Sequence, residues 1–123
     1  QTSITKLNRK IAYQRPCSSR YLPEDDLLLD EIFDLIGVER VDRRYDRKDA
    51  LCCGAECSIV QAERLKPYQE KNVADALEHR AEAMVFLCPG CYAVLGPMAQ
   101  QKDMAPIFVS DLCRMGLGEK YFP

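Results

Sequence analysis

Five of the seven cysteines in this 123-residue chain follow a regular pattern, which constrains the fold more than any other feature. Cys17 is followed after 34 residues by the pair Cys52-Cys53, and Cys53 is followed after another 34 by Cys88-x-x-Cys91. Thiolates are soft, reactive ligands, so this distribution indicates iron or zinc. A structural zinc is satisfied by four ligands, which five thiolates would exceed, whereas a multi-iron cluster can use them. The pattern therefore predicts a fold in which three distant segments meet.

The length and composition are typical of one globular domain. Residues 1–123 are enough to bury an ordinary apolar core, and the hydrophobic fraction is 47%. The net charge is −2 and the basic residues form no stripe, which argues against nucleic acid as a partner. No apolar run approaches the ~20 residues of a bilayer span, so we expect no direct membrane span. The first residue is Gln1, which suggests a domain cut from a longer chain.

The cysteine count also bears on the compartment. An odd number leaves one thiol unpaired in any complete disulfide scheme, and no secretory signal precedes the domain. We therefore expect a reducing, cytoplasmic location, where such cysteines bind metal or carry redox chemistry. A secreted domain held by disulfides is the alternative, although a core of this size needs no such links.

Apolar patterns of two kinds alternate along the chain. Short apolar runs predict strands at residues 10–13, 38–41, 84–87 and 107–109. Helices are predicted at residues 24–36, at 58–81 with a break or kink at Pro67, at 89–101, and from Ser110 or Asp111 to about 116–118. This order favours an α/β fold with a small parallel sheet flanked by helices.

The first predicted helix carries an apolar stripe that is expected to face the sheet. The stripe comprises Leu28, Ile32, Leu35 and Ile36, and Leu29 and Phe33 widen it. Gly37 is expected to end this helix, because glycine readily takes the conformation of a C-terminal cap.

The predicted topology brings the cysteines together. Cys17 follows the first strand and Cys88 follows the third, so both lie at carboxyl ends of parallel strands, where ligand sites of open α/β sheets occur. Cys52-Cys53 follows the polar loop 42–49, and Gly54 relaxes the backbone behind it. We therefore predict that the cysteines converge at the carboxyl ends of the strands.

The two cysteine motifs each have a second interpretation. Cys88-x-x-Cys91 opens a helix, whose N-terminus lowers thiol pKa values and offers N–H groups to cluster sulfurs. A redox disulfide of the thioredoxin kind would need these two cysteines alone. Adjacent side chains in extended backbone point in opposite directions, so Cys52-Cys53 suits different atoms of a cluster better than one small ion. Two small buried side chains are the alternative for the pair.

Other residues near the motifs carry weaker signals. Cys57 is an additional candidate ligand, and a small core side chain at a helix start is the alternative. Cys113 is predicted to belong to the core of the last helix, and His79 to be a solvated surface residue. Three basic residues either offset the charge of a thiolate-bound cluster or serve surface solubility, namely Arg15, Arg20 and Lys48.

The spacing of the five cysteines, together with Gly54 and the flanking Pro16 and Pro89, resembles a known family. It is similar to the cysteine-rich CCG domain found in the disulfide-cleaving component of heterodisulfide reductase. Related domains occur in subunits of some succinate dehydrogenases, of glycolate and lactate oxidases and of sulfite-reduction complexes. The resemblance covers about residues 10–118.

In that family the cysteines hold an iron–sulfur cluster, of a non-cubane four-iron kind in heterodisulfide reductase itself. The resemblance implies a [4Fe-4S] or non-cubane cluster here, bound by Cys17, Cys52, Cys53, Cys88 and Cys91. It also implies an oxidoreductase that relays electrons and, in its full assembly, reduces a disulfide. The implied partners are other redox subunits or a second CCG domain, through which the domain could also associate with a membrane. No catalytic residue is implied.

One position departs from the family. A His often follows the Tyr in a Tyr-His-x-Pro-Cys setting, whereas this chain has Tyr13-Gln14-Arg15-Pro16, so a proton-handling role of that His has no counterpart here. The main alternative function is a structural zinc site in an interaction domain, held by four of the five cysteines. The chain shows no Ser-His-Asp set, phosphate-cradling glycine loop or paired carboxylates at a strand end, which leaves hydrolases and nucleotide enzymes without support.

Overall fold

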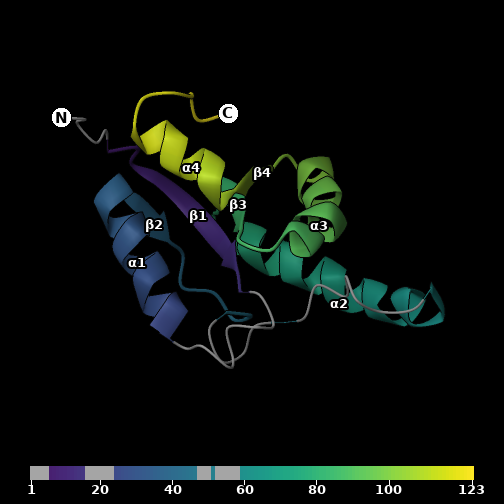
Figure 1. The fold of residues 1–123 in the computed structure, drawn as a ribbon. Coiled ribbons are helices and arrows are strands. Elements are labelled where there is room, and N and C mark those ends of the chain that lie inside the picture. The colour runs from purple at the N-terminus through teal and green to yellow at the C-terminus, as the bar shows by residue number, and fades with distance from the viewer. Residues whose placement is uncertain (1–5, 16–23, 47–50, 52–58) are drawn as a thin grey trace.

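The structure is a computed structural model that describes residues 6–15, 24–46, 51 and 59–123, without the side chains of residues 25 and 59–63. In this part of the chain, four parallel strands form one sheet in the order β2-β1-β3-β4 (Figure 1). The elements are β1 (Arg9–Gln14), α1 (Glu24–Ile36), β2 (Val38–Arg40), α2 (Ile59–Glu78), β3 (Ala83–Phe86), α3 (Pro89–Gln101), β4 (Ala105–Phe108) and α4 (Val109–Gly116). The predicted α/β fold with a small parallel sheet and flanking helices is confirmed.

The central position of β1 follows from its apolar sequence. Ile11 is paired with Arg40 of β2 on one side and with Ala83 of β3 on the other. Residues 11–14 are buried, as expected for a strand with helices on both faces of its sheet. Successive side chains point to opposite faces, so Ile11 and Tyr13 enter one half of the core and Ala12 enters the other.

Helices α1 and α4 cover one face of the sheet (Figure 1). The buried residues on this face are Ile11, Tyr13, Leu29, Phe33, Ile36, Val38, Ala83, Val85, Ile107, Leu112 and Met115. The rings of Tyr13 and Phe33 meet edge-on with centroids 5.6 Å apart, a contact that contributes about 0.5–1.5 kcal/mol beyond burial. This contact ties α1 to the middle of β1.

Helices α2 and α3 cover the opposite face. The buried residues there are Ala12, Val41, Val73, Ala76, Ala81, Met84, Phe86, Cys91, Leu95, Ala99 and Met104. Among the described helices, none combines the length and the apolar character needed to cross a membrane.

The buried side of α1 differs from the predicted stripe. Leu29, Phe33 and Ile36 are buried as expected, but Leu28 and Leu35 are each 54% exposed. Leu27, Leu28 and Leu29 are consecutive, so the helix has apolar residues on more than one side. The side that packs against the sheet is the one that carries Phe33, whose ring contacts Tyr13.

Helix α2 is continuous over 20 residues, so of the predicted break or kink at Pro67 the break does not occur. Pro67 is exposed, which places its ring on the solvent side of the helix, where a local loss of hydrogen bonding is tolerated. The helix ends at Glu78, earlier than predicted. Ala81 is instead a buried residue of the turn before β3, where Arg80 takes a positive φ of 67°.

The boundary between β4 and α4 also lies earlier than predicted. Phe108 is the N-cap residue in an extended conformation, and Val109 begins the helix instead of ending the strand. Neither Ser110 nor Asp111 caps the helix, because both lie within its first turn. Asp111 nevertheless suits that turn, since its negative charge interacts favourably with the helix dipole.

Gly37 ends α1 as predicted, with a φ of +80°. A Cβ at this position would lie 2.8 Å from Cδ and 3.0 Å from Cα of Lys6, so glycine is needed for both conformation and space. The Lys6 ammonium donates to the carbonyl oxygens of Asp34 and Leu35 at 3.0 and 2.9 Å. This cation adds a donor at the end of α1, where the Asp34 carbonyl oxygen also accepts from the Gly37 N–H at 3.1 Å.

Candidate metal centre at the carboxyl edge of the sheet

The Cys88-x-x-Cys91 motif lies at the junction of β3 and α3. Cys88 is the N-cap of α3, with extended backbone angles (φ −96°, ψ 127°), and Pro89 follows in the first turn. Proline fits there because the first N–H groups of a helix have no intrahelical acceptor. The Cys88 side chain makes no capping hydrogen bond. Both thiols therefore stand at the N-terminus of α3, as predicted.

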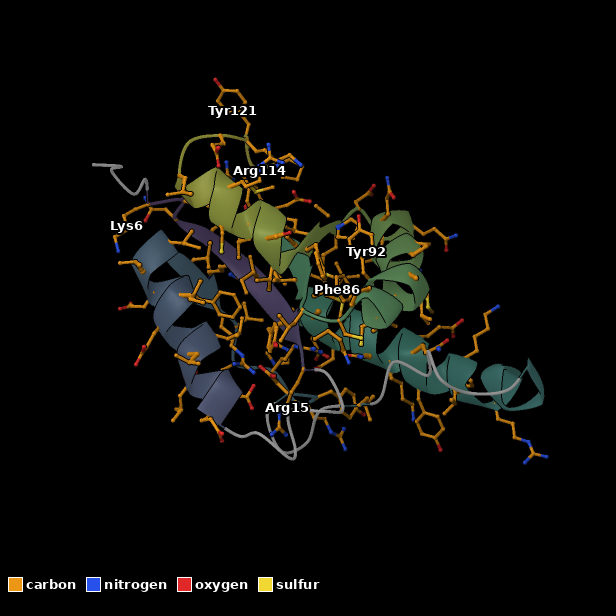
Figure 2. The ribbon with its side chains drawn as sticks, in the orientation of Figure 1. Lys6, Arg15, Phe86, Tyr92, Arg114 and Tyr121 are labelled. Carbon is orange, nitrogen blue, oxygen red and sulfur yellow. The ribbon has the colours of Figure 1, made fainter. Side chains whose placement is uncertain are left out.

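The two thiols have different surroundings. Cys88 is half-buried and packs against the core, whereas Cys91 is 2% exposed and belongs to the core. The neighbouring Tyr92 ring meets Phe86 and Phe108 edge-on, with centroids 5.7 and 6.1 Å apart (Figure 2). These rings form an apolar wall beside the motif, on the side of β3 and β4.

Two further segments reach the same edge of the sheet. Gln14 ends β1 and is aligned with the last residue of β3, two positions before Cys88. The Gln14 Nε2 donates to the carbonyl oxygen of Leu51 at 2.9 Å. In the sequence, Gln14 stands three residues before Cys17 and Leu51 stands one before Cys52. The chain segments that lead to the three cysteine motifs therefore meet at the carboxyl edge of the sheet.

The structure describes two of the predicted ligands, Cys88 and Cys91. Several predicted residues lie outside the described residues, namely Cys17, Cys52, Cys53, the additional candidate Cys57, and the basic residues Arg20 and Lys48. Within the described ranges, no group of three or more His, Cys, Asp or Glu side chains is arranged to hold a metal ion. The complete ligand set therefore stays a prediction.

A network of hydrogen-bonded, buried polar side chains lies at this edge of the sheet. Gln14 is 1% exposed and Asn72, on α2, is fully buried. The Asn72 amide donates to Gln14 Oε1 at 2.7 Å, and its own oxygen accepts from Arg43 Nη1 at 2.8 Å. Arg43 Nη2 donates to the carbonyl oxygen of Tyr13 at 3.1 Å. The network therefore contacts β1 twice, at the Gln14 side chain and at the Tyr13 carbonyl oxygen. It connects the strand to Asn72 on α2 and to Arg43 in the segment after β2.

Arg43 is the charged member of this network. Its side chain is 0% exposed, and burial lowers its pKa although the carboxylates of Asp46 and Asp75 oppose the shift. Asp75 Oδ2 accepts from Arg43 Nη1 at 3.3 Å and from the Tyr45 backbone N–H at 2.9 Å. Within the described part of the chain, Arg43 Nε has no hydrogen-bond acceptor. Guanidinium remains protonated in proteins, so the buried charge depends on the carboxylates of Asp46 and Asp75, of which Asp75 is the one hydrogen-bonded to it.

Arg40 is a second buried cation at this edge. It donates to both carboxylate oxygens of Asp46 at 2.9 and 2.6 Å and to Asp30 at 3.0 Å, and its guanidinium lies 4.8 Å from the centroid of the Tyr13 ring. Burial alone lowers its pKa, but hydrogen bonds and charge attraction to Asp46 and Asp30 raise it overall. The loop after β2 is therefore fixed to the sheet by bidentate charge-assisted hydrogen bonds.

Arg15 lies at the end of β1, just beyond Gln14 (Figure 2). Its Nε is 2.7 Å from the carboxylate of Asp26 on α1, and the two side chains are only 15% and 12% exposed. Arg15 is therefore not a freely solvated surface residue. Its charge is balanced by a carboxylate of the domain itself.

Cys113 and His79 lie where the sequence placed them. Cys113 is half-buried on α4 beside the core, and burial raises the pKa of its thiol, which disfavours the thiolate that a metal needs. His79 follows α2 and is exposed, with its ring Nδ1 2.8 Å from the carbonyl oxygen of Asp75. The core role of Cys113 and the surface position of His79 are confirmed.

Comparison with protein families agrees with the cysteine geometry. The family model of the CCG cysteine-rich domain matches residues 11–96, from β1 into α3. The chain belongs to the CCG cysteine-rich domain family. No curated protein matches the chain. Membership indicates metal or cluster binding through the cysteines, and the matched range is narrower than the 10–118 over which the sequence resembles the family.

The donors that this CCG domain presents fit such a group chemically. Cys88 and Cys91 are thiols three positions apart at a helix N-terminus, a spacing common to zinc sites and iron–sulfur clusters. Either group needs two or more further donors. The other cysteines of the motif would have to provide them.

The sequence analysis did not identify the polar network of the CCG domain. Gln14 and Asn72 are ordinary surface residue types, and neither belongs to a known ligand pattern. Two signals were nevertheless present: Gln14 directly continues the apolar run of β1, and Asn72 lies beside Val73 on the side of α2 that faces the core. A polar residue inside an apolar pattern indicates a buried hydrogen-bonding role.

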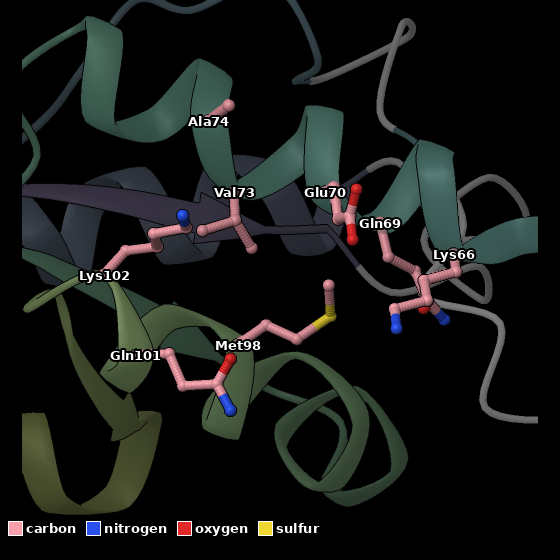
Figure 3. A pocket seen from close by; sticks show the side chains of 8 residues that line it. All are labelled: Lys66, Gln69, Glu70, Val73, Ala74, Met98, Gln101 and Lys102. Carbon is pink, nitrogen blue, oxygen red and sulfur yellow. The ribbon is translucent and has the colours of Figure 1, made fainter.

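A separate groove of about 760 Å³ lies between α2 and α3 (Figure 3). Its lining residues are Lys66, Gln69, Glu70, Val73, Ala74, Met98, Gln101 and Lys102. Val73 and Met98 give it an apolar middle, and Lys66 and Lys102 stand at opposite ends. Among the residues that the structure describes, no cysteine lines this groove.

Proposed function

We propose that this CCG domain binds an iron–sulfur cluster and relays electrons in an oxidoreductase that resembles heterodisulfide reductase. The proposed ligands are Cys17, Cys52, Cys53, Cys88 and Cys91. The observation that carries the proposal is that the end of β1, Leu51 and the start of α3 meet at one edge of the sheet. An extended chain spans at most ~3.6 Å per residue, so the short intervals from Gln14 and Leu51 keep the other motifs within reach of this edge.

The chain itself would hold and shield the group. A bound cluster supplies one-electron redox chemistry, whose potential depends on hydrogen bonds to its sulfurs and on its exposure to water. The N-terminus of α3 offers backbone N–H groups, and the core around Cys91 together with the Tyr92 ring excludes water on one side. These features support a redox role over a purely structural one.

We further propose that the domain works with a partner. Reduction of a disulfide to two thiols takes two electrons, whereas a cluster passes them one at a time, so a second cluster-bearing domain or another redox subunit would supply the second electron. Thiolate ligands persist in reducing compartments, so we place the assembly in the cytoplasm, with any membrane association provided by partner subunits.

The test of cluster binding is metal content under anaerobic conditions, because thiols oxidise in air. Purified protein, reconstituted with ferrous iron and sulfide, should contain iron and sulfide in similar amounts and absorb visible light. Protein that takes up no iron, or that binds one zinc per chain with four thiols in preference to iron, would contradict the proposal and favour a structural zinc site.

Cys88→Ser and Cys113→Ser form a matched pair, because both cysteines are half-buried. Cys88→Ser should strongly reduce the iron content, as should Cys53→Ser, while Cys113→Ser should leave it unchanged. Equal losses from Cys88→Ser and Cys113→Ser would show that the thiols at the edge have no special role.

A further inference from the structure

Gln14 is a polar residue at the buried end of an apolar strand. A buried amide lowers stability unless its polar atoms find partners. Gln14 finds them, because Nε2 donates to the Leu51 carbonyl oxygen at 2.9 Å and lies 3.4 Å from the Arg15 carbonyl oxygen, while Oε1 accepts from Asn72 at 2.7 Å. The side chain therefore connects β1 to the residue that precedes the cysteine pair.

We propose that Gln14 is a positioning residue for Cys52-Cys53, and that its amide holds the backbone at Leu51 on the end of β1. The proposal rests on the proposed function for the role of the pair as ligands. The hydrogen bond itself joins two groups of the chain, so it can be tested separately from metal binding.

The orientation of the Gln14 amide is set by its neighbours. Arg43 can only donate, so the Asn72 oxygen must face Arg43 and the Asn72 nitrogen must face Gln14. Gln14 must then present its oxygen to Asn72 and its nitrogen to Leu51. The direction of each hydrogen bond thus follows from one buried cation, and the amide of Gln14 has no equally good alternative orientation.

This arrangement matters for metal binding because ligand side chains need accurate placement. A bound metal tolerates little error in the positions of its donors, and groups around the ligands commonly provide that accuracy. Leu51 is adjacent to the first cysteine of the pair, so fixing its carbonyl limits the rotation of the chain just before the ligands.

The first experiment uses the reduced, metal-free protein and measures alkylation of each cysteine by peptide mass spectrometry. Gln14→Met keeps the shape of the side chain but removes both hydrogen bonds. The hydrogen bond to Leu51 is the one expected to restrain the segment before Cys52, and its loss should make local opening there roughly three- to tenfold more frequent. The alkylation rates of Cys52 and Cys53 should rise by the same factor, while that of Cys113 is unchanged.

The matched control is Ile11→Val, in the same strand but on the other face of the sheet. It removes one buried methylene without touching the network, so it should leave the alkylation of Cys52 and Cys53 as in the wild type. Asn72→Leu also removes an acceptor of the buried Arg43, so it should raise the alkylation of Cys52 and Cys53 at least as much as Gln14→Met. Adding Gln14→Met to it should then have little further effect, because the two residues act as one unit. A similar rise in Ile11→Val, or a rise that includes Cys113, would overturn the proposal.

The second experiment reconstitutes the same variants with ferrous iron and sulfide and records iron content and the electron paramagnetic resonance spectrum. Gln14→Met should bind less iron and show a changed spectrum, and Ile11→Val should match the wild type. Wild-type iron content and spectrum in Gln14→Met would refute the positioning role. If the wild type binds no iron, the proposed function fails, while the alkylation rates still decide whether Gln14 holds the segment at Leu51.

Discussion

Replacement of Asp75 by alanine tests the buried charge at the carboxyl edge of the sheet. The Asp75 carboxylate accepts from the Arg43 guanidinium at 3.3 Å and from the backbone N–H groups of Tyr45 and Arg44 at 2.9 and 3.3 Å. The Arg43 side chain is 0% exposed, so water cannot replace the lost carboxylate. Removal of one partner from a buried ion pair costs about 3–5 kcal/mol, although the Asp46 carboxylate still offsets part of the Arg43 charge.

This loss is large relative to the roughly 5–15 kcal/mol that stabilises a typical domain. At about 3–5 °C per kcal/mol for a chain of this size, Asp75→Ala should lower the melting temperature by about 10–20 °C. The assays are thermal and urea unfolding of the reduced, metal-free protein, followed by far-ultraviolet circular dichroism at pH 7. The control is Glu70→Ala, an exposed position on the same helix, which should change the free energy of unfolding by no more than about 0.5 kcal/mol.

A double variant separates the uncompensated charge from general damage to α2. Arg43→Met combined with Asp75→Ala removes both charges, so it should be less destabilised than the sum of the single variants by about 0.5–3 kcal/mol. If Asp75→Ala is no more destabilised than Glu70→Ala, or if the two substitutions are simply additive, the buried guanidinium does not depend on this carboxylate.

Three other changes test the fold. Leu95→Ala, at a fully buried position, should lower the free energy of unfolding by about 2–5 kcal/mol in urea experiments. Leu35→Ala, at a 54% exposed position on α1, should lower it by less than about 0.5 kcal/mol. Equal losses would contradict the assigned exposed face of α1. Gly37→Ala should lower the melting temperature more than Gly118→Ala, because both have positive φ but only the first lacks space for a Cβ; the reverse order would refute the close approach. The backbone N–H of Lys10 in β1 donates to Glu82 and lowers the pKa of its carboxyl group, against the effect of burial. The ionised Glu82 therefore stabilises the fold above about pH 4.5, and this stabilisation is lost as the pH falls through the lower pKa of the folded state. Glu82→Gln should make the free energy of unfolding less dependent on pH in this acid range, and an unchanged dependence would contradict the assignment.

The strands and most helices could be predicted because their apolar periods are strong. The run around Ile11 and the run around Val85 could only be buried strands of a parallel sheet, and Gly37 marked a helix end. The buried side of α1 could not be chosen in the same way. Leu28 and Leu29 satisfy the helical period equally well, and only the contact between Phe33 and Tyr13 decides between them.

The end of β4 illustrates a different limit. Val109 is β-branched and apolar, so its residue type favours a strand. In the structure the pairing with β3 ends at Phe108, and Val109 turns into α4. The tertiary position of the neighbouring strand overrides the local preference.

The candidate site was predictable only in part, for a similar reason. The spacing of the cysteines indicates a metal centre, because few other functions require thiols in that arrangement. The supporting residues give no such signal, since Gln14 and Asn72 are 58 positions apart and Arg43 and Asn72 are 29 apart. Their association depends on how α2 packs on the sheet, which no local pattern contains.

The two edges of the sheet differ in a way that supports the location of the site. At the amino edge, Glu82 pairs with Arg9 at 3.1 Å while both side chains are more than 40% exposed, an arrangement that water can replace at little cost. At the carboxyl edge, Gln14, Asn72 and Arg43 are buried, so the loss of a single hydrogen-bond partner there strongly lowers the stability of the fold. The network also satisfies backbone groups, because the carbonyl oxygens of Tyr13 and Leu51 accept from Arg43 and Gln14, so apolar side chains could not replace it without loss of stability. Its position beside the cysteine motifs therefore ties the stability of this edge to the segments that lead to the proposed ligands.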